Sequence, residues 1–421
     1  MQHNRRNFLK TAAILTSAAA YSSQIVSLTN ANESDSVVFP DWQEGFLDIH
    51  HISTGRGNAT FMIAPDGTTL LIDAGDMSDG RPDNTVLPRL PNASKTPGEW
   101  IAAYIKQFSK PLKRNGTDLD YVLLTHFHSD HIGVRQKTVI EKNGYALSGI
   151  TMVAESLGIG KLVDRDFPDY NFPSRQSIER ESGKFLKDYL AFIDDQQKNR
   201  KTVIEKFVPG SQEQFTLKYA PKKYPFSIQN IAANCIVWTG NGTETQTVFP
   251  QDAKPDENMC SCVIKLSYGN FAYFSGGDCS GTPEKRDMET PVANVVGRVD
   301  AMSMNHHAYI DVANPNFLVK SRPRVMVIPV WDTWHPHVQT LTRMTDKNIY
   351  PDQREIFATG LHEENTTRLG NLVKSIVHPQ GHIVIRVTDN GTKYRVFVLN
   401  ATSETPGVLF TTEEFIACAT G

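Results

Sequence analysis

The feature that most constrains this chain is a run of histidines and an aspartate directly after an apolar segment. Residues 119–125 (LDYVLLT) are a continuous apolar run, which is typical of a strand buried on both faces of a sheet. The next six residues are HFHSDH, with polar side chains at His126, His128, Asp130 and His131. A hydrophobic core could not supply hydrogen-bond partners for three imidazole rings and a carboxylate so close together. The run therefore predicts a metal site at a strand end.

Imidazole and carboxylate groups are ligands that suit Zn²⁺ and similar divalent ions. In a turn after a strand, His126 and His128 can bind one ion while Asp130 and His131 bind a second. Two adjacent ions suit hydrolysis, because they lower the pKa of a water and polarise the scissile group. We expect two Zn²⁺ ions, with Mn²⁺ or Fe as alternatives, and a catalytic Asp130 that also orients the attacking water. A chance polar cluster on a loop is the alternative.

The rest of the chain alternates between strand-like and helix-like segments. Hairpins are predicted at residues 46–75, 261–278 and 381–400, each around a short turn such as Pro65-Asp66-Gly67. Residues 98–109 have the apolar spacing of a helix. Residues 134–225 are interpreted as an insertion or lid that includes a polar, helix-prone stretch at 173–200. We therefore expect an α+β protein.

The motif His-x-His-x-Asp-His after an apolar strand resembles the metallo-β-lactamase superfamily. Supporting pieces on both sides of this motif resemble the branch that holds the soluble hydrolase domain of DNA-uptake competence proteins and the phosphorylcholine esterases. In order, they are LLIDAG at residues 70–75, Gly277-Asp278, His306-His307 and the His335-Pro336-His337 element. The resemblance spans about residues 46–390. It implies a four-layer αββα sandwich, the metallo-β-lactamase fold, formed by residues 32–421 as one hydrolase domain.

The resemblance also assigns roles to residues outside the first motif. It implies that Asp278 bridges two metals and that one of His306 and His307 completes the second site, its neighbour being structural or substrate-facing. Asp73 would accept a hydrogen bond from a ligand histidine. His335 and His337 either reach the mouth of the site or belong to a structural loop. The His50-His51 pair is interpreted as structural.

Two departures from the superfamily pattern stand out. Many members supply a further histidine to the first metal from the middle of the chain, but this chain has none between His131 and His306. The first site is then completed by Asp278 and water alone, or by Asp164 or Asp166, or the enzyme uses a single metal. The competence branch often has Gly-Gln-Gly-Asp in its first turn, where this chain has GRGN at residues 55–58. That difference weakens the analogy with DNA processing.

The first 31 residues resemble a twin-arginine secretory signal, with Arg5 and Arg6 before a short apolar run. We expect export to the periplasm or medium by the twin-arginine machinery, with an N-terminal anchor as the alternative. No later segment is long and apolar enough to suggest a stable membrane span after signal removal. Removal of residues 1–31 takes away three cations and no acid, so the net charge changes from -3 to -6. This negative net charge makes nucleic acid an unlikely partner.

The function predicted from these features is an exported metal-dependent hydrolase that uses metal-activated water. Its expected partner is a small-molecule or phosphoester substrate, and phosphoester cleavage is the first choice by the branch resemblance. A lactone, cyclic amide or thioester is the alternative substrate class. If the protein is not an enzyme, the alternative is an exported metal-binding protein without catalytic activity.

Overall fold

The computed structural model describes residues 37–77, 85–112, 118–137, 140–183, 185–249, 254–283 and 286–418. The predicted signal at residues 1–31 lies outside this part of the chain. Within the described residues, none of the helices has the length and apolar character needed to cross a bilayer.

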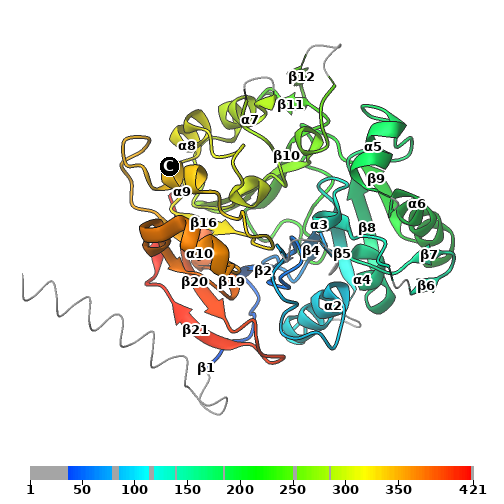
Figure 1. Cartoon of the computed structure of the whole chain (residues 1–421), viewed down its shortest axis with the longest axis horizontal. Helices are drawn as coiled ribbons and strands as arrows, with labels where there is room; N and C mark the ends of the chain where they lie inside the picture. The colour runs from blue at the N-terminus through cyan, green and yellow to red at the C-terminus, as the bar shows by residue number, and fades with distance from the viewer. Residues whose placement is uncertain are drawn as a thin grey trace, which may run out of the picture.

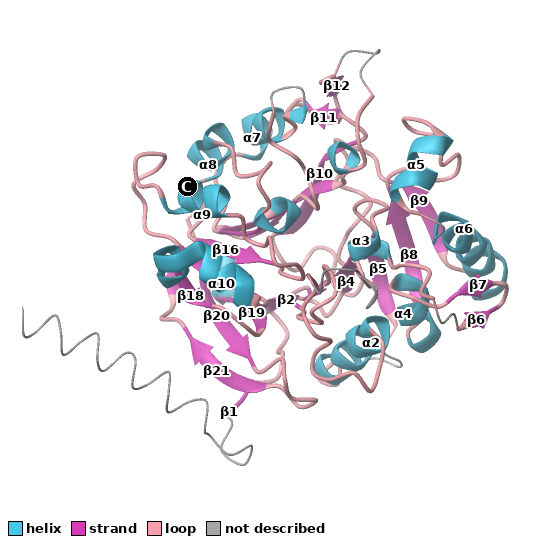
Figure 2. Cartoon of the chain, in the orientation of Figure 1, coloured by secondary structure: helices cyan, strands magenta, loops and turns pink. Residues whose placement is uncertain are grey.

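Most strands belong to two large mixed sheets (Figure 2). In spatial order, the larger sheet holds β1 (Val37–Val38), β21 (Gly407–Thr411), β20 (Lys393–Leu399), β19 (His382–Thr388), β2 (Leu47–His51), β3 (Thr60–Ile63), β4 (Thr69–Ile72), β5 (Leu119–Leu123), β8 (Ile159–Asp164) and β9 (Val203–Lys206), with β22 (Phe415–Ile416) on β20. The other holds β12 (Thr245–Thr247), β11 (Ile236–Trp238), β10 (Phe226–Ala233), β13 (Val263–Tyr268), β14 (Phe271–Ser275), β15 (Ala301–Ser303), β16 (Val325–Ile328), β17 (Glu355–Ala358) and β18 (Ile376–His378). A separate short ribbon pairs β6 (Glu141–Lys142) with β7 (Tyr145–Ala146).

Helices cover the outer face of each sheet, on opposite sides of the molecule (Figure 1). The larger sheet is covered by α2 (Pro97–Phe108), α4 (Ile150–Ser156) and α6 (Phe185–Asp195). The other sheet is covered by α7 (Glu289–Val296), α8 (Pro315–Ser321) and α9 (Val338–Thr345). Further helices are α3 (Ser129–Ile132), α5 (Arg175–Glu181), α10 (Glu363–Leu369) and the turns η2 (Gln196–Arg200), η3 (Asn258–Cys260), η5 (Asn305–Ala308), η6 (Gly370–Ser375) and η7 (Asp389–Gly391).

The alternation of apolar side chains along the strands explains why the sheets pack into layers. Leu70 and Ile72 of β4 join Leu266 and Tyr273 of the other sheet in the core between the sheets. Leu71 points the other way, into the core beneath the helices of the larger sheet. Strand side chains alternate between faces, so each inner strand contributes to two cores. The predicted αββα sandwich is confirmed.

The local elements expected from the sequence are also present. The β3–β4, β13–β14 and β19–β20 pairs are antiparallel hairpins, as predicted. Helix α2 begins with a capping box in which Thr96 and Glu99 satisfy each other's backbone N–H groups, and Pro97 occupies the first turn. A capping box and an N-terminal proline are strong local signals for a helix start.

The interpretation of residues 134–225 as an insertion needs correction. Strand β8 pairs in parallel with β5, and β9 pairs in parallel with β8, so both belong to the larger sheet. Between them, α5 and α6 form a crossover, and α6 buries Phe185 and Tyr189 in the core beneath the helices. The apolar part of β8 is short and carries exposed and half-buried residues at Gly160 and Lys161. That pattern is too weak to identify a sheet strand from sequence alone.

Candidate metal centre

The candidate site is built from loops that follow strands at one edge of the sandwich. Asp73 follows β4, and the His126–His131 motif follows β5 and continues into α3. Asp278 follows β14 and the His306-His307 pair follows β15 in the other sheet. Parallel neighbours such as β4 and β5 end at the same edge of a sheet, so residues distant in sequence meet there.

The close packing of these loops requires a glycine at position 75. A Cβ on Gly75 would lie 1.9 Å from the carbonyl oxygen of Asp130. The loop after β4 therefore packs directly against α3 only because residue 75 has no side chain. Asp73, two residues earlier, has a left-handed backbone with φ of 60° and directs its carboxylate toward the His126–His131 motif.

One group of ligand atoms consists of four buried side chains. His307 Nε2 lies 2.9 Å from Asp130 Oδ2 and 3.3 Å from His131 Nε2. Asp278 Oδ1 lies 3.1 Å from His131 Nε2 and 3.6 Å from His307 Nε2. Metal–ligand bonds of 2.0–2.2 Å in a tetrahedron place ligand atoms about 3.3–3.6 Å apart. These four atoms therefore surround a point at distances that suit a metal ion.

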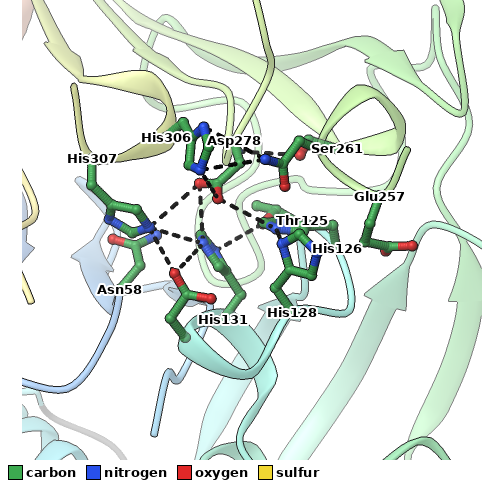
Figure 3. Close-up of polar contacts among 12 residues, drawn as sticks. Asn58, Thr125, His126, His128, His131, Glu257, Ser261, Asp278, His306 and His307 are labelled. Carbon is green, nitrogen blue, oxygen red and sulfur yellow. Dashed lines mark hydrogen bonds and ion pairs between the residues drawn. The ribbon is translucent and has the colours of Figure 1, made fainter. Parts of the chain in front are cut away.

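A second group shares Asp278 with the first. His126 Nε2 lies 3.1 Å from His128 Nδ1 and 3.5 Å from Asp278 Oδ2. The ligand atoms of His126, His128 and Asp278 all lie within 4.8 Å of one another. Figure 3 shows Asp278 in the middle of the histidines, with its two oxygens directed to different rings. Its carboxylate lies between the two groups of ligand atoms and belongs to both.

Each histidine of the centre is held through the ring nitrogen that faces away from Asp278. His131 Nδ1–H donates to Asp73 Oδ2 over 2.7 Å, and His307 Nδ1–H donates to the Pro329 carbonyl over 2.8 Å. The other contacts are His306 Nδ1 to Asp311 at 2.7 Å, His126 Nδ1 to Thr125 Oγ1 at 3.1 Å, and His128 Nε2 to Glu181 at 3.5 Å. Such partners fix the tautomer and leave the other nitrogen free for a metal.

The electrostatics of the site favour a bound cation. Burial alone would raise the pKa of Asp278, but the surrounding histidines, led by His131 and His307, hold that pKa well below its usual range. Burial opposes protonation of His131, yet Asp278, Asp73 and Asp130 raise its pKa well above the usual value. Protons on the rings thus compensate buried carboxylates in the metal-free protein, and divalent ions would compensate them in the same place.

The donor set fits divalent metals of the zinc type. Asp278 Oδ1 is buried and receives no hydrogen bond of good geometry from any described residue. A buried acceptor of this kind needs a partner, and a cation would supply it. Imidazole and carboxylate ligands suit Zn²⁺, Mn²⁺ and Fe²⁺ alike.

A cavity of about 670 Å³ opens over the centre. The centre contributes His128, Asp130, Asp278 and His306 to its walls, and the remaining lining residues include Glu181, Tyr309, Trp331, Asp332, Trp334 and His335. Of the two residues predicted as possible substrate contacts, only His335 lines this cavity, where it stacks on His307 with ring centroids 4.7 Å apart. His337 instead begins α9 by accepting from the Gln339 N–H, which favours the structural one of the two alternatives left open for it.

The two aspartates considered for the first metal are used elsewhere. Asp164 accepts hydrogen bonds from the hydroxyls of Tyr170 and Tyr189 and from two backbone N–H groups. Asp166 accepts from the Phe172 N–H and pairs with Lys206. Both carboxylates therefore hold the loop after β8, and neither is among the groups that could hold a metal in the described part of the chain.

Sequence reasoning missed three residues that support the histidines. Thr125 directly precedes the motif, and its hydroxyl donates to Asp73 and accepts from His126. Asp311 lies five residues after His306, a separation that a turn could have suggested. Glu181 lies 53 residues from His128, and nothing in its sequence surroundings indicates the contact.

The fold and the site together define a metallo-β-lactamase-fold protein with a candidate dinuclear metal centre. Residues 53–134, which contain the whole His126–His131 motif, match the family described as the metallo-beta-lactamase superfamily. The match covers the N-terminal part of the described fold, from the loop after β2 to the end of the metal-binding motif. A comparison with curated proteins gave no match.

Three solved structures show a distant similarity to this chain. The metallo-beta-lactamase fold protein YhfI from Bacillus subtilis is 12% identical, with 81% of this chain and 99% of that chain covered and a TM-score of 0.37. A CmlA beta-hydroxylase mutant is 12% identical at a TM-score of 0.37, covering 83% of this chain, which spans only 55% of that protein. Zn²⁺-bound PqqB from Methylobacterium extorquens is 11% identical, with coverages of 62% and 72% and a TM-score of 0.32. Resemblances this distant transfer neither substrate nor mechanism.

Proposed function

We propose that this protein is an exported metal-dependent hydrolase that cleaves a phosphoester with metal-activated water. The observation that carries the proposal is the position of Asp278, whose two oxygens face two different groups of ligand atoms. When bound, two divalent ions at such a site lower the pKa of a water and stabilise the charge that develops on the scissile group. Paired ions of this kind suit in-line displacement at phosphorus.

The protein side chains would position both ions and the water. Asp278 would bridge the two sites, while Asp130 and the ring nitrogens supply the remaining ligands. Asp130 also lines the cavity, and although burial would raise its pKa, His131 and His307 hold that pKa well below its usual range. It therefore stays ionised at neutral pH and can accept a hydrogen bond that orients the attacking water.

The cavity also supports a substrate class. Its walls carry the aromatic rings of Tyr309, Trp331 and Trp334 and the additional carboxylates Glu181 and Asp332. The lining residues in the described part of the chain include no lysine or arginine. We therefore propose a small phosphoester whose other substituent is aromatic, uncharged or cationic, and no extended polyanion such as nucleic acid.

A substrate panel tests this function. Purified protein loaded with Zn²⁺ or Mn²⁺ would be assayed with bis(p-nitrophenyl) phosphate, p-nitrophenyl phosphate, a homoserine lactone and an acyl thioester. We expect kcat/KM for a phosphoester to exceed that for the carbonyl substrates by at least about tenfold, with activity lost in chelator and in the His128→Ala variant. A lactone or thioester as the best substrate would show that the phosphoester assignment is wrong. Bound metal with no turnover of any substrate would favour a non-catalytic metal-binding protein.

Export by the twin-arginine machinery is a separate proposal, supported by the sequence RRNFLK followed by a short apolar run. The test is the location of the full chain in a bacterial host. We expect the protein outside the cytoplasm, and we expect Arg5→Lys with Arg6→Lys to retain it inside. An unchanged location of that double variant would exclude twin-arginine export.

A further inference from the structure

We propose that His306 is a ligand of the first metal site, where it takes the place of the middle histidine that this chain lacks. His306 and His307 would then each serve a different ion. The inference rests on the metal centre proposed above and is independent of the substrate. The group at the first metal site has three evident ligands, His126, His128 and Asp278, whereas the group at the second site has four, Asp130, His131, Asp278 and His307.

The two oxygens of Asp278 divide the neighbouring histidines between the two sites. Asp278 Oδ1 faces His131 and His307, at 3.1 and 3.6 Å from their Nε2 atoms. Asp278 Oδ2 faces His126 and His306, at 3.5 and 3.7 Å from their Nε2 atoms. His306 therefore lies on the side of the bridge that belongs to the first site, as the contacts drawn in Figure 3 show.

The ring of His306 is oriented for metal binding. Its Nδ1 lies 2.7 Å from Asp311 Oδ1, which accepts that proton and leaves Nε2 directed toward Asp278. This is the arrangement that also holds His131 against Asp73. A histidine held by a carboxylate through its remote nitrogen is typical of metal ligands.

The backbone explains how two adjacent histidines can both face one carboxylate. In a regular strand, successive side chains point to opposite faces. Here His306, His307 and Ala308 have φ values of 43°, 53° and 58°, a run of left-handed residues without glycine. Such a conformation is strained for residues other than glycine, and the strain persists where the surroundings enforce it. Asn305 anchors the turn by donating to the buried Glu289.

Two other side chains near the first site are less suited to the role. Asn258 presents its amide Nδ2, a donor that cannot bind a cation, at 3.4 Å from His306 Nε2. Glu181 lies 3.5 Å from His128 Nε2, which is the ring nitrogen remote from His126. We infer that Asn258 packs beside the His306 ring and that Glu181 orients His128.

Metal counting in single and double variants tests the assignment. Wild type is expected to bind about two Zn²⁺ per chain, and His306→Ala about one, with the lost ion bound at least about tenfold more weakly. His126→Ala combined with His306→Ala should still bind about one ion, because both changes affect the same site. His131→Ala combined with His306→Ala should bind essentially none. The His337→Ala variant, at a half-buried histidine outside the cavity, is the matched control and should bind as wild type does.

Three outcomes would overturn the assignment. Two tightly bound ions in His306→Ala would show that His306 is no ligand. Loss of all metal in the His126 and His306 double variant, with one ion kept in the His131 and His306 double variant, would place His306 in the second site. Loss of one ion in Asn258→Ala, with His306→Ala unaffected, would assign the role to Asn258. Circular dichroism of each metal-free variant checks folding, and His306→Gln, which keeps a polar side chain beside Asp311, replaces any variant that fails it.

Discussion

The molecule contains two pairs of adjacent histidines with opposite environments. His50 and His51 lie inside β2 with regular strand geometry, and their rings contact the hydroxyls of Tyr104, Thr60 and Tyr273. His306 and His307 follow β15 in a left-handed turn and face the carboxylates of the candidate centre. The same His-His dipeptide is thus a structural pair in β2 and a pair of candidate metal ligands after β15.

The difference lies in the partners and in the backbone. Burial lowers the pKa of His51 to about 3. Burial also acts against His306, yet Asp278 and Asp311 raise the pKa of its ring to about 9. A buried histidine pair therefore becomes a candidate metal site when carboxylates accompany it and when the backbone turns both rings the same way.

The largest expected effect comes from the carboxylate that the ligand histidines share. Asp278→Asn removes the bridging charge, so we expect metal content to fall from about two ions per chain to below about one. Hydrolytic activity should fall by more than roughly 100-fold, which is the upper end of the loss caused by removing a hydrogen-bond partner of a metal ligand. Elemental analysis and kcat/KM measure the two effects. Retention of two tightly bound ions would show that Asp278 does not bridge them.

A smaller effect is expected for the carboxylates that hold the rings. Asp311→Asn should weaken metal binding at the first site, and Asp73→Asn should weaken metal binding at the second site, each by about 10–100-fold. Because metal must displace the proton on the His306 ring, whose pKa Asp278 and Asp311 raise to about 9, affinity at the first site should fall as pH decreases. Competition with a chromophoric chelator between pH 6 and 9 measures both effects. Equal loss of both ions in Asp311→Asn would contradict the division between sites.

The structural pair should show its effect in stability alone. The pKa of His51 is about 3 in the folded chain, below its ordinary value of 6.5. Its stabilising contribution is therefore complete above pH 6.5 and is lost as pH falls toward 3. The free energy of unfolding should decrease by up to about 1.4 kcal/mol per pH unit from this one group.

Urea unfolding of wild type and His51→Gln at pH 7 and pH 5 measures that contribution. We expect a shallower pH dependence in the variant, which has no proton to gain at this position, and an unchanged metal content. A His51→Gln variant that loses an ion would contradict the distinction between the two histidine pairs.

The smallest effect is expected at His337, which begins α9 outside the cavity. His337→Ala removes the side-chain acceptor at the helix start, which costs about 0.5–1 kcal/mol of stability. We expect kcat/KM within about twofold of wild type, because the side chain does not line the cavity. A large loss of activity without a loss of stability would return His337 to the substrate site.

The sequence by itself determined the local parts of this protein. The His126–His131 motif, the buried strand before it, the hairpins and α2 all depend on residues close together in the chain. Their signals are apolar periodicity, turn residues and helix caps, and each is complete within about ten residues. The superfamily and the layered fold followed from the order of these parts.

Only the tertiary structure decided how distant residues are shared among the ligand groups. Asp164 and Asp166 had the right chemistry for a ligand, but the loop after β8 uses them for its own hydrogen bonds. The proposed role of His306 depends on its contacts with Asp278 and Asp311 and on a left-handed turn. No pattern of neighbouring residues predicts this combination. The place of β8 and β9 in the larger sheet was not predicted, because sheet pairing depends on partners far away in sequence. Contacts of this kind are set by the packing of whole layers, and sequence spacing alone does not encode them.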